Sequence, residues 1–329
     1  MFGLDKLLKV IDPEPVLIDQ QACLRSRHIR SACRACSDIC PENAFGFEDR
    51  KLTVDPALCS RCGLCLGACP TAALQVRGVD ESQFDGALEV RCAHAPGDGV
   101  ALPCLGALSP DHIVDLGSRR PGVALVAGDC AACPMARGGE RARASLAAAV
   151  ETLSALGHSE LPVWRTKAEA AAPEQVQAVS RRDLLALWGR SAVQTGRSLL
   201  PDREVNPVKL PAKVPARRLR WLKRFAAPEH DGRMRWPTRQ VAAGCIACNI
   251  CVAFCPTGAL VSREGEDRTW TLSLQTVACV DCGTCMQLCP RSLISPGEGP
   301  QIREVLSGAR TDLVTVPGDQ RPVKGARPW

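Results

Sequence analysis

The chain has 329 residues, a formal net charge of +6, 46% hydrophobic residues, 20 cysteines and no tyrosine, which leaves room for two or three domains. The N-terminal stretch MFGLDKLLKVIDPEP lacks the apolar core of a signal peptide, and no run of about 18 apolar residues occurs, so we expect neither a secreted disulfide framework nor a membrane-spanning helix. We therefore expect a cytoplasmic protein whose cysteines stay reduced and bind metal.

The first block of cysteines contains two copies of one template. They read CRACSDICPENAF (33–45) and CSRCGLCLGACPTAAL (59–74), and the second has the complete spacing C-x2-C-x2-C-x3-C-P. In the first copy Arg30 stands where the opening cysteine belongs, and the nearest spare thiol is Cys23. We predict a first domain over residues 1–80.

Residues 85–165 predict a small α/β domain. Strands are expected at 87–92, 99–104, 122–130 and in LPVWRTK, with helices at 109–120 and 138–157 between them. Such alternation indicates partly parallel strand pairing. Four cysteines lie at expected strand ends or in the following loops, and we name them site M: Cys92, Cys104, Cys130 and Cys133.

Residues 166–239 predict a helix, at 180–200, followed by a basic linker. Residues 203–239 carry a local net charge of +8, so the rest of the chain is close to neutral. Within them ARRLRWLKRFA predicts a short amphipathic helix with Leu219, Leu222 and Phe225 on one side. Residues 213–225 are then expected to dock on an acidic partner, to make peripheral contact with an anionic membrane, or to pack on a neighbouring domain. No nucleic-acid binding is expected.

The last block of cysteines repeats the template twice more. The copies are CIACNICVAFCPTGAL (245–260) and CVDCGTCMQLCPRSLI (279–294), both with complete spacing. The four copies form two similarly spaced pairs, which is the signature of an internal repeat. We predict a second paired domain over residues 240–300 and a tail over 301–329.

The paired template resembles the bacterial-type ferredoxin domain that holds two [4Fe–4S] clusters, as found in polyferredoxins. In such domains three cysteines of each motif bind one cluster, and the cysteine before proline binds the cluster of the other motif. The resemblance implies four [4Fe–4S] clusters on four ligand sets. These are site A (Cys23, Cys33, Cys36, Cys69), site B (Cys40, Cys59, Cys62, Cys65), site C (Cys245, Cys248, Cys251, Cys289) and site D (Cys255, Cys279, Cys282, Cys285).

Site A is the irregular one, because it uses Cys23 in place of Arg30. We interpret Cys23 as a ligand carried on a loop insertion. The alternative is a [3Fe–4S] cluster on three cysteines, with Cys23 in a structural role.

Site M is open to three interpretations. The first is a [2Fe–2S] cluster, because residues 90–134 resemble the delta iron–sulfur subunit of methyl-viologen-type hydrogenases, which connects a hydrogenase to heterodisulfide reductase. They are also similar to thioredoxin-like [2Fe–2S] ferredoxins, apart from the last spacing. The second is a structural Zn²⁺, which a Cys₄ set also fits. The third is a group of reduced thiols without metal, and His94 is a minor candidate ligand.

Together these features predict an α+β protein with two ferredoxin-like dicluster [4Fe–4S] domains flanking a small α/β domain. No phosphate-binding glycine loop and no catalytic triad pattern is evident. We therefore expect an electron-transfer iron–sulfur protein, acting as a subunit or partner of an oxidoreductase complex such as a formate dehydrogenase, a hydrogenase or a heterodisulfide-reductase-like enzyme. The alternative is a redox enzyme that uses Cys130 and Cys133 as a dithiol or metal site.

Overall fold

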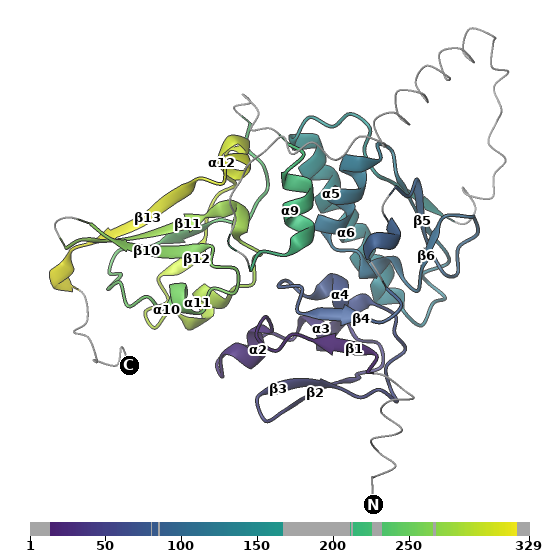
Figure 1. Cartoon of the computed structure of the whole chain (residues 1–329), viewed down its shortest axis with the longest axis horizontal. Coiled ribbons are helices and arrows are strands. Elements are labelled where there is room, and N and C mark those ends of the chain that lie inside the picture. The colour runs from purple at the N-terminus through teal and green to yellow at the C-terminus, as the bar shows by residue number, and fades with distance from the viewer. Residues whose placement is uncertain are drawn as a thin grey trace, which may run out of the picture.

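The computed structural model describes residues 14–79, 81–84, 86–166, 211, 213–225, 232–265 and 268–320. The helix expected at 180–200 lies outside the described residues, as do the first thirteen residues and the last nine. The described chain forms three units, which we call the N-terminal unit (14–79), the middle unit (86–166) and the C-terminal unit (232–320). Figure 1 shows the C-terminal unit at one end of an elongated molecule and the other two stacked at the opposite end.

The N-terminal unit is built from two short antiparallel strand pairs and three short helices. In chain order these are β1 (Val16–Ile18), α2 (Leu24–Arg27), α3 (Ala35–Ile39), β2 (Phe45–Glu48), β3 (Lys51–Val54), α4 (Leu64–Ala68) and β4 (Leu74–Val76). Strand β1 pairs with β4, and β2 pairs with β3 as a hairpin. Helix α2 is the loop insertion that follows Cys23.

The middle unit is a four-stranded sheet in the order β6-β5-β7-β8, and all three strand pairs are parallel. Its elements are β5 (Glu89–Cys92), β6 (Val100–Leu102), a 3₁₀ turn η2 (Leu105–Ala107), α5 (Pro110–Arg119), β7 (Ala124–Ala127), α6 (Ala136–Ala155) and β8 (Val163–Thr166). A further 3₁₀ turn, η1 (Glu81–Phe84), precedes them. Every residue of β7 is buried, as expected for a central parallel strand. Helix α5 begins at Pro110 because the Ser109 backbone N–H and hydroxyl both bond His112 Nδ1, each at 2.9 Å.

The C-terminal unit repeats the plan of the N-terminal unit and adds to it. Its elements are β9 (Arg239–Val241), α10 (Ile250–Ala253), β10 (Leu260–Glu264), β11 (Trp270–Gln275), η3 (Thr276–Ala278), α11 (Thr284–Leu288), β12 (Ile294–Pro296), α12 (Ile302–Ser307), β13 (Arg310–Val316) and η4 (Gly318–Gln320). Strand β9 pairs with β12, and a second sheet has the order β10-β11-β13. The segment expected as a tail therefore supplies a helix and a third strand, because β13 satisfies the free edge of β11.

Helix α9 (Ala216–Leu222) occupies the basic stretch and packs on α5 (Figure 1). Its Arg218 forms an ion pair with Asp111 at 3.0 Å, and Trp221, which is fully buried, donates from Nε1 to the same carboxylate at 3.1 Å. Two further arginines of this stretch, Arg220 and Arg224, pair with Asp115. The apolar side of α9 is thus turned into the protein. The expected membrane or partner contact of residues 213–225 would require this helix to leave α5.

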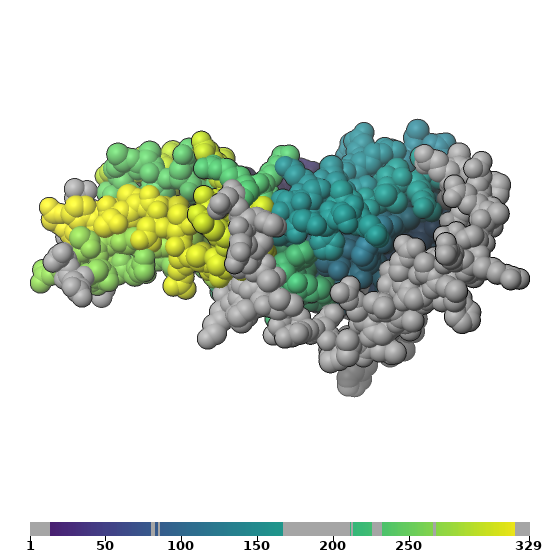
Figure 2. Space-filling view, turned by 90° about the horizontal axis from the view of Figure 1, so that it is seen from above, coloured from purple at the N-terminus to yellow at the C-terminus, as the bar shows by residue number. Residues whose placement is uncertain are grey.

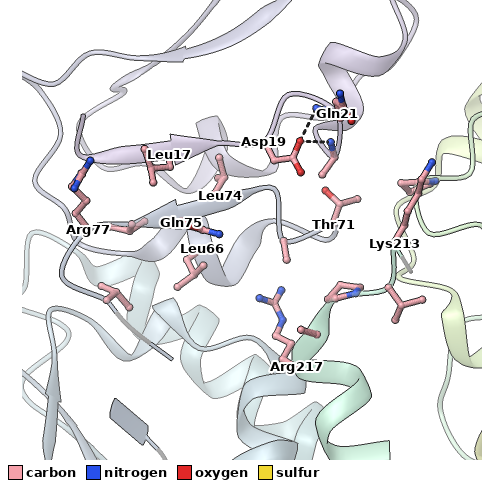
Figure 3. Close-up of a pocket in the computed structure, with 18 of the residues that line it drawn as sticks. Leu17, Asp19, Gln21, Leu66, Thr71, Leu74, Gln75, Arg77, Lys213 and Arg217 are labelled. Atoms are coloured by element: carbon pink, nitrogen blue, oxygen red, sulfur yellow. Dashed lines mark hydrogen bonds between the residues drawn. The ribbon is translucent and has the colours of Figure 1, made fainter. Parts of the chain in front are cut away.

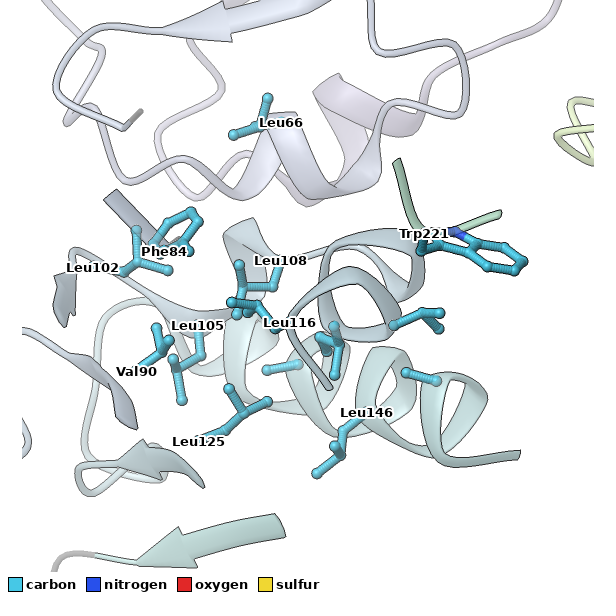
Figure 4. Close-up of a cluster of buried hydrophobic side chains, with 14 of the residues drawn as sticks. Leu66, Phe84, Val90, Leu102, Leu105, Leu108, Leu116, Leu125, Leu146 and Trp221 are labelled. Atoms are coloured by element: carbon cyan, nitrogen blue, oxygen red, sulfur yellow. The ribbon is translucent and has the colours of Figure 1, made fainter. Parts of the chain in front are cut away.

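Two hydrophobic cores hold the chain together. The larger core is continuous from the N-terminal unit through the middle unit to Trp221 and α12, as the labelled side chains from Leu66 to Trp221 illustrate (Figure 4). The smaller core lies within the C-terminal unit, around Leu260, Leu274 and Ile294. The C-terminal unit extends away from the other two in the space-filling view (Figure 2). Among the helices of the described residues, none is long and apolar enough to cross a membrane.

Candidate iron–sulfur sites

The cysteine loops are shaped by residues in the left-handed backbone region. In each complete motif two residues flank the second cysteine with positive φ: Arg61 and Gly63, Ala247 and Asn249, Asp281 and Gly283. One more residue with positive φ lies two positions after the proline of each Cys-Pro pair, and these residues are Asn43, Ala72, Gly258 and Ser292. Alternation between right- and left-handed backbone turns successive N–H groups toward one concave side, which suits a negatively charged cluster. The first motif lacks the flanking pair, and its Arg34 has a φ of −131°.

The thiols of site A come from outside the first motif as well as from inside it. The pKa of the Cys36 thiol is raised to about 12, mainly by burial and also by the charges of Cys69, Cys33 and Cys23. The pKa of Cys33 is raised by burial and by Cys69 and Cys23 as well. Cys23, which precedes α2 and is 8% exposed, therefore lies with the other three thiols of this set.

The four thiols of site B likewise lie close together, around Cys65 of α4. Burial raises the pKa of Cys65, which lies inside that helix, and the thiols of Cys62, Cys59 and Cys40 add to the effect. The two N-terminal sets are neighbours, since Cys36 of site A also raises the pKa of Cys65.

Sites C and D each line one small cavity of the C-terminal unit. All four cysteines of site C line the first cavity, and all four of site D line the second, together with Arg239. The pKa of Cys251 is raised to about 12 and that of Cys279 to about 11, in both cases mainly by burial and with contributions from the neighbouring thiols. The pKa of Cys251 is also raised by Cys285, so these two sites are adjacent too.

Site M lies at the carboxyl ends of the parallel strands, where loops converge. Its four cysteines line a third cavity with His94 and Trp164. Glycines at the start of α6 leave room for the sulfurs: a Cβ at Gly138 would lie 2.5 Å from Cys104 Sγ, and one at Gly139 would lie 2.7 Å from Cys130 Sγ. A larger residue at either position would displace a thiol.

Backbone N–H groups point at the sulfurs of these sites. Gly128 donates to Cys92 Sγ at 3.1 Å, Ala73 to Cys69 Sγ at 3.3 Å, and Leu293 to Cys289 Sγ at 3.4 Å. Further donors reach Cys40, Cys104 and Cys133. Such bonds stabilise thiolates and tune the potential of a cluster that they ligate. Buried thiols with raised pKa values need cationic metal to become thiolates, and binding then releases their protons.

Two buried donors close to the sites have no hydrogen-bond partner in the described part of the chain. They are Nε1 of Trp164, whose side chain lines the site M cavity, and Nε of Arg239, whose side chain lines the site D cavity. Inorganic sulfide is an acceptor that suits both, so the donor sets fit iron–sulfur clusters. Within the described residues, no group of three or more His, Cys, Asp or Glu is close enough to hold a single metal ion.

The two halves of the molecule meet beside sites A and D. The Ala32 N–H donates to Gln287 Oε1 at 3.4 Å, and the rings of His28 and Phe254 contact edge to face at 4.4 Å. The charge of Cys282 accordingly raises the pKa of Cys33 across this contact. Site A is therefore the neighbour of site D.

Site M is in turn the neighbour of site B. The pKa of Cys104 is raised to about 11, by burial first and then by the charge of Cys62. The two sites approach through glycines, because a Cβ at Gly106 would lie 2.5 Å from Leu64 Cδ2, and one at Gly67 would lie 2.5 Å from the Gly106 oxygen. Leu64 lies between two site B cysteines and is 1% exposed. The five thiol sets thus follow one another in the order M, B, A, D, C.

A larger cavity of about 780 Å³ lies apart from the thiols, between the β1–β4 pair and the start of α9 (Figure 3). Asp19 and Arg77 line it from the N-terminal unit, and Lys213 and Arg217 line it from the other side. None of the cysteines is among the described residues that line it. The cavity therefore lies where the N-terminal unit, the segment around α9 and the C-terminal unit meet.

Sequence reasoning missed the supporting residues of these sites. The Gly138–Gly139 pair directly after the last site M cysteines is a local signal that was available in the sequence. Trp164 and Arg239 carry no such signal, because each reaches its site from a strand far along the chain.

Comparison with known proteins identifies part of this arrangement. The family model of the 4Fe-4S dicluster domain matches residues 30–73 and 244–293, which is less than half of the chain. No curated protein matches, and no solved structure matches. The resemblance of the middle segment to the hydrogenase delta subunit finds no support in these comparisons.

The chain therefore carries two 4Fe-4S dicluster domains, one in each of its outer units, and these domains imply [4Fe–4S] clusters. They support an iron–sulfur protein of electron transfer, with a repeated architecture. The use of Cys130 and Cys133 as a dithiol stays a prediction; burial raises the pKa of Cys130, and the charge of Arg143 acts against this effect.

Proposed function

We propose that the protein is a relay of single electrons, with four [4Fe–4S] clusters on sites A, B, C and D and a [2Fe–2S] cluster on site M. The observation that carries the proposal is the contact between the two dicluster regions, where the Ala32 N–H next to Cys33 donates to Gln287 Oε1 and the rings of His28 and Phe254 meet, so that the two regions form one series of five sites. Each cluster supplies a one-electron couple when bound. The chain's own residues space the sites, bury them and direct N–H groups at their sulfurs.

The ligand sets follow from the thiols that are gathered. Site A includes Cys23, because that thiol raises the pKa of both Cys33 and Cys36. Site M is assigned a cluster rather than a structural Zn²⁺ because it lies directly beside site B and because Trp164 Nε1 offers a donor to sulfide.

The two ends of the series are site M in the middle unit and site C in the C-terminal unit. A relay without a substrate site of its own needs an electron donor at one end and an acceptor at the other. We therefore propose that the protein serves as a subunit or partner of an oxidoreductase complex of the formate dehydrogenase, hydrogenase or heterodisulfide-reductase-like kind.

Iron and acid-labile sulfide analysis of anaerobically purified protein tests the cluster content. Four cubanes and one [2Fe–2S] cluster give roughly 18 irons per chain, and cubanes alone give roughly 16. Fewer than about eight irons in reconstituted protein would contradict the relay.

The Cys104→Ser variant tests site M separately. It should lose the [2Fe–2S] signal in the EPR spectrum of the reduced protein and keep the four cubane signals. An unchanged iron content in this variant would reassign site M to zinc or to free thiols, and bound zinc would be detected by elemental analysis.

A further inference from the structure

A buried arginine enters the C-terminal unit directly beside site D. Arg239 is the first residue of β9 and is only 5% exposed. Its side chain lines the same small cavity as the four cysteines of site D. Its guanidinium donates from Nη2 to Asp281 Oδ1 and from Nη1 to the Thr238 carbonyl, both at 2.6 Å. The two bonds fix the positive charge against the thiols.

The charge of Arg239 lies close to the thiols of site D. The side chains of Arg239, Cys279 and Cys285 line one small cavity, and both cysteines are only 9% exposed. Arg239 Nε, buried and without a hydrogen-bond partner in the described residues, is a further donor at this site.

The charge is only weakly balanced by its acidic partner. The Asp281 side chain is 67% exposed, so water screens its carboxylate, whereas the Arg239 side chain is 2% exposed. The other arginine beside site D, Arg218, donates to the Cys279 carbonyl at 2.6 Å but is paired with Asp111, whose side chain is 14% exposed. Arg239 therefore contributes most of the net positive charge that faces this site.

The repeat supplies the comparison that isolates this residue. Ile294 and Leu74 each follow the last cysteine of their motifs by five positions, and they pair with Val241 and Ile18. Counting outward along the paired strands, Arg239 occupies the position that Val16 occupies in the N-terminal unit. Val16 is 1% exposed. One position of one scaffold thus holds a buried apolar side chain in the N-terminal unit and a buried cation beside site D in the C-terminal unit.

We propose that Arg239 raises the reduction potential of the cluster on site D. An electron in the series then occupies this cluster, at the junction of the two units, in preference to its neighbours. Reduction adds a negative charge to a cluster, and a fixed buried cation stabilises the charge where solvent cannot screen it. Arginine suits this role because it keeps its charge when buried. The inference rests on the proposed assignment of a [4Fe–4S] cluster to site D.

The test is a potentiometric titration of the full cluster-loaded chain, followed by EPR. Arg239→Val, which copies the residue of the N-terminal unit, should move one of the four cubane midpoints to more negative potential and leave the others in place. We expect the reduced-to-oxidised ratio of that cluster at fixed potential to fall at least tenfold, which corresponds to about 59 mV for a one-electron couple. Arg239→Lys should restore most of the midpoint.

A second variant acts with the opposite sign. Asp281→Asn removes the carboxylate while retaining a residue that tolerates the positive φ of 52° at this position. It should shift the same midpoint to more positive potential by a smaller amount. The matched control is Arg263→Val, which removes an arginine whose side chain is 58% exposed on β10, and it should shift no midpoint.

The outcomes separate this inference from the assignment of the cluster. If Arg239→Val contains all the iron of the parent and no midpoint moves, or all four move together, the inference is wrong and the relay stands. If the parent protein itself contains no cubane on site D, judged by an unchanged iron content in Cys282→Ser, the relay assignment fails. If Arg239→Val loses the cluster, the midpoints of Arg239→Lys and Asp281→Asn test the inference instead. An Asp281→Asn midpoint equal to that of the parent overturns the inference.

Discussion

The N-terminal and C-terminal dicluster regions hold equivalent cysteine loops, but they are supported by different parts of the chain. Sites A and B are buried against the middle unit, and the core there is continuous from Val16 to Leu153. Sites C and D have a core of their own and a three-stranded sheet completed by β13. The difference shows that the template fixes the loops, whereas the burial that a cluster needs comes from whichever elements are nearby.

The regions also differ in how regular their motifs are. The C-terminal unit forms both loops with paired left-handed residues, while the first N-terminal loop lacks them and depends on Cys23 and α2. The C-terminal unit has the buried Arg239 where its counterpart has Val16. We therefore expect the two regions to differ in robustness and in potential, and four substitutions test these differences from the largest effect to the smallest.

The loss of a cluster is the largest effect, and Cys23→Ser tests it on the irregular site. We expect site A to lose its [4Fe–4S] cluster, so that iron falls by roughly four of about 18 atoms per chain. The matched variant in the regular motif is Cys245→Ser, which should lose the same amount from site C. An EPR spectrum and iron content unchanged by Cys23→Ser alone would assign Cys23 a structural role.

Arg218→Leu should break the connection between the middle and C-terminal units. It leaves Asp111, whose side chain is 14% exposed, without the arginine that holds its pKa low against the effect of burial. Breaking such a buried pair costs about 3–5 kcal/mol. A lowered thermal midpoint of the cluster-loaded protein measures this loss. The exposed pair of Arg263 with Asp312 is the control, and Arg263→Leu should leave the thermal midpoint almost unchanged because exposed ion pairs add little stability.

Gly67→Ala should push the N-terminal unit away from the middle unit. The added Cβ would lie 2.5 Å from the Gly106 oxygen and 2.7 Å from the Ala107 oxygen, and neither backbone atom can move alone. Overpacking of this kind costs about 1–3 kcal/mol. Chemical denaturation of the cluster-loaded protein measures it, and we also expect weaker magnetic interaction between sites B and M.

The C-terminal counterpart of Gly67 in the third motif is Ala253, which is exposed. Ala253→Gly should cost only about 0.5–1 kcal/mol through helix propensity. If Gly67→Ala and Ala253→Gly lower the free energy of unfolding equally, the contact at Gly67 does not stabilise the N-terminal unit.

Gln287→Ala gives the smallest expected effect on stability. The bond from Ala32 to Gln287 Oε1 is 3.4 Å long and exposed, so its loss costs at most about 1 kcal/mol. The variant should weaken the contact between the two halves of the molecule. EPR of the reduced protein should then show a smaller spin–spin interaction between sites A and D. An undiminished interaction would show that the rings of His28 and Phe254 are sufficient to hold the two sites together.

The sequence by itself determined the parts of the protein that are encoded within about a dozen consecutive residues. The repeated spacing identified two dicluster domains, which the family comparison confirms, and the alternation of apolar segments predicted the strands and helices that the middle unit has. These features are local, because a cysteine loop or a helix start such as Ser109 is fixed by its immediate neighbours along the chain.

Only the tertiary structure decided the rest. It brought the loops of Cys33 and Cys282 together, joined β13 to β11, buried Trp221 of the basic helix and set Arg239 at the position equivalent to that of Val16. Each of these contacts joins residues that are far apart in sequence or depends on strand register, and their formation is governed by burial and pairing of the whole chain rather than by local pattern. The motifs therefore say where clusters are held, and the packing says in which order and in what electrostatic surroundings.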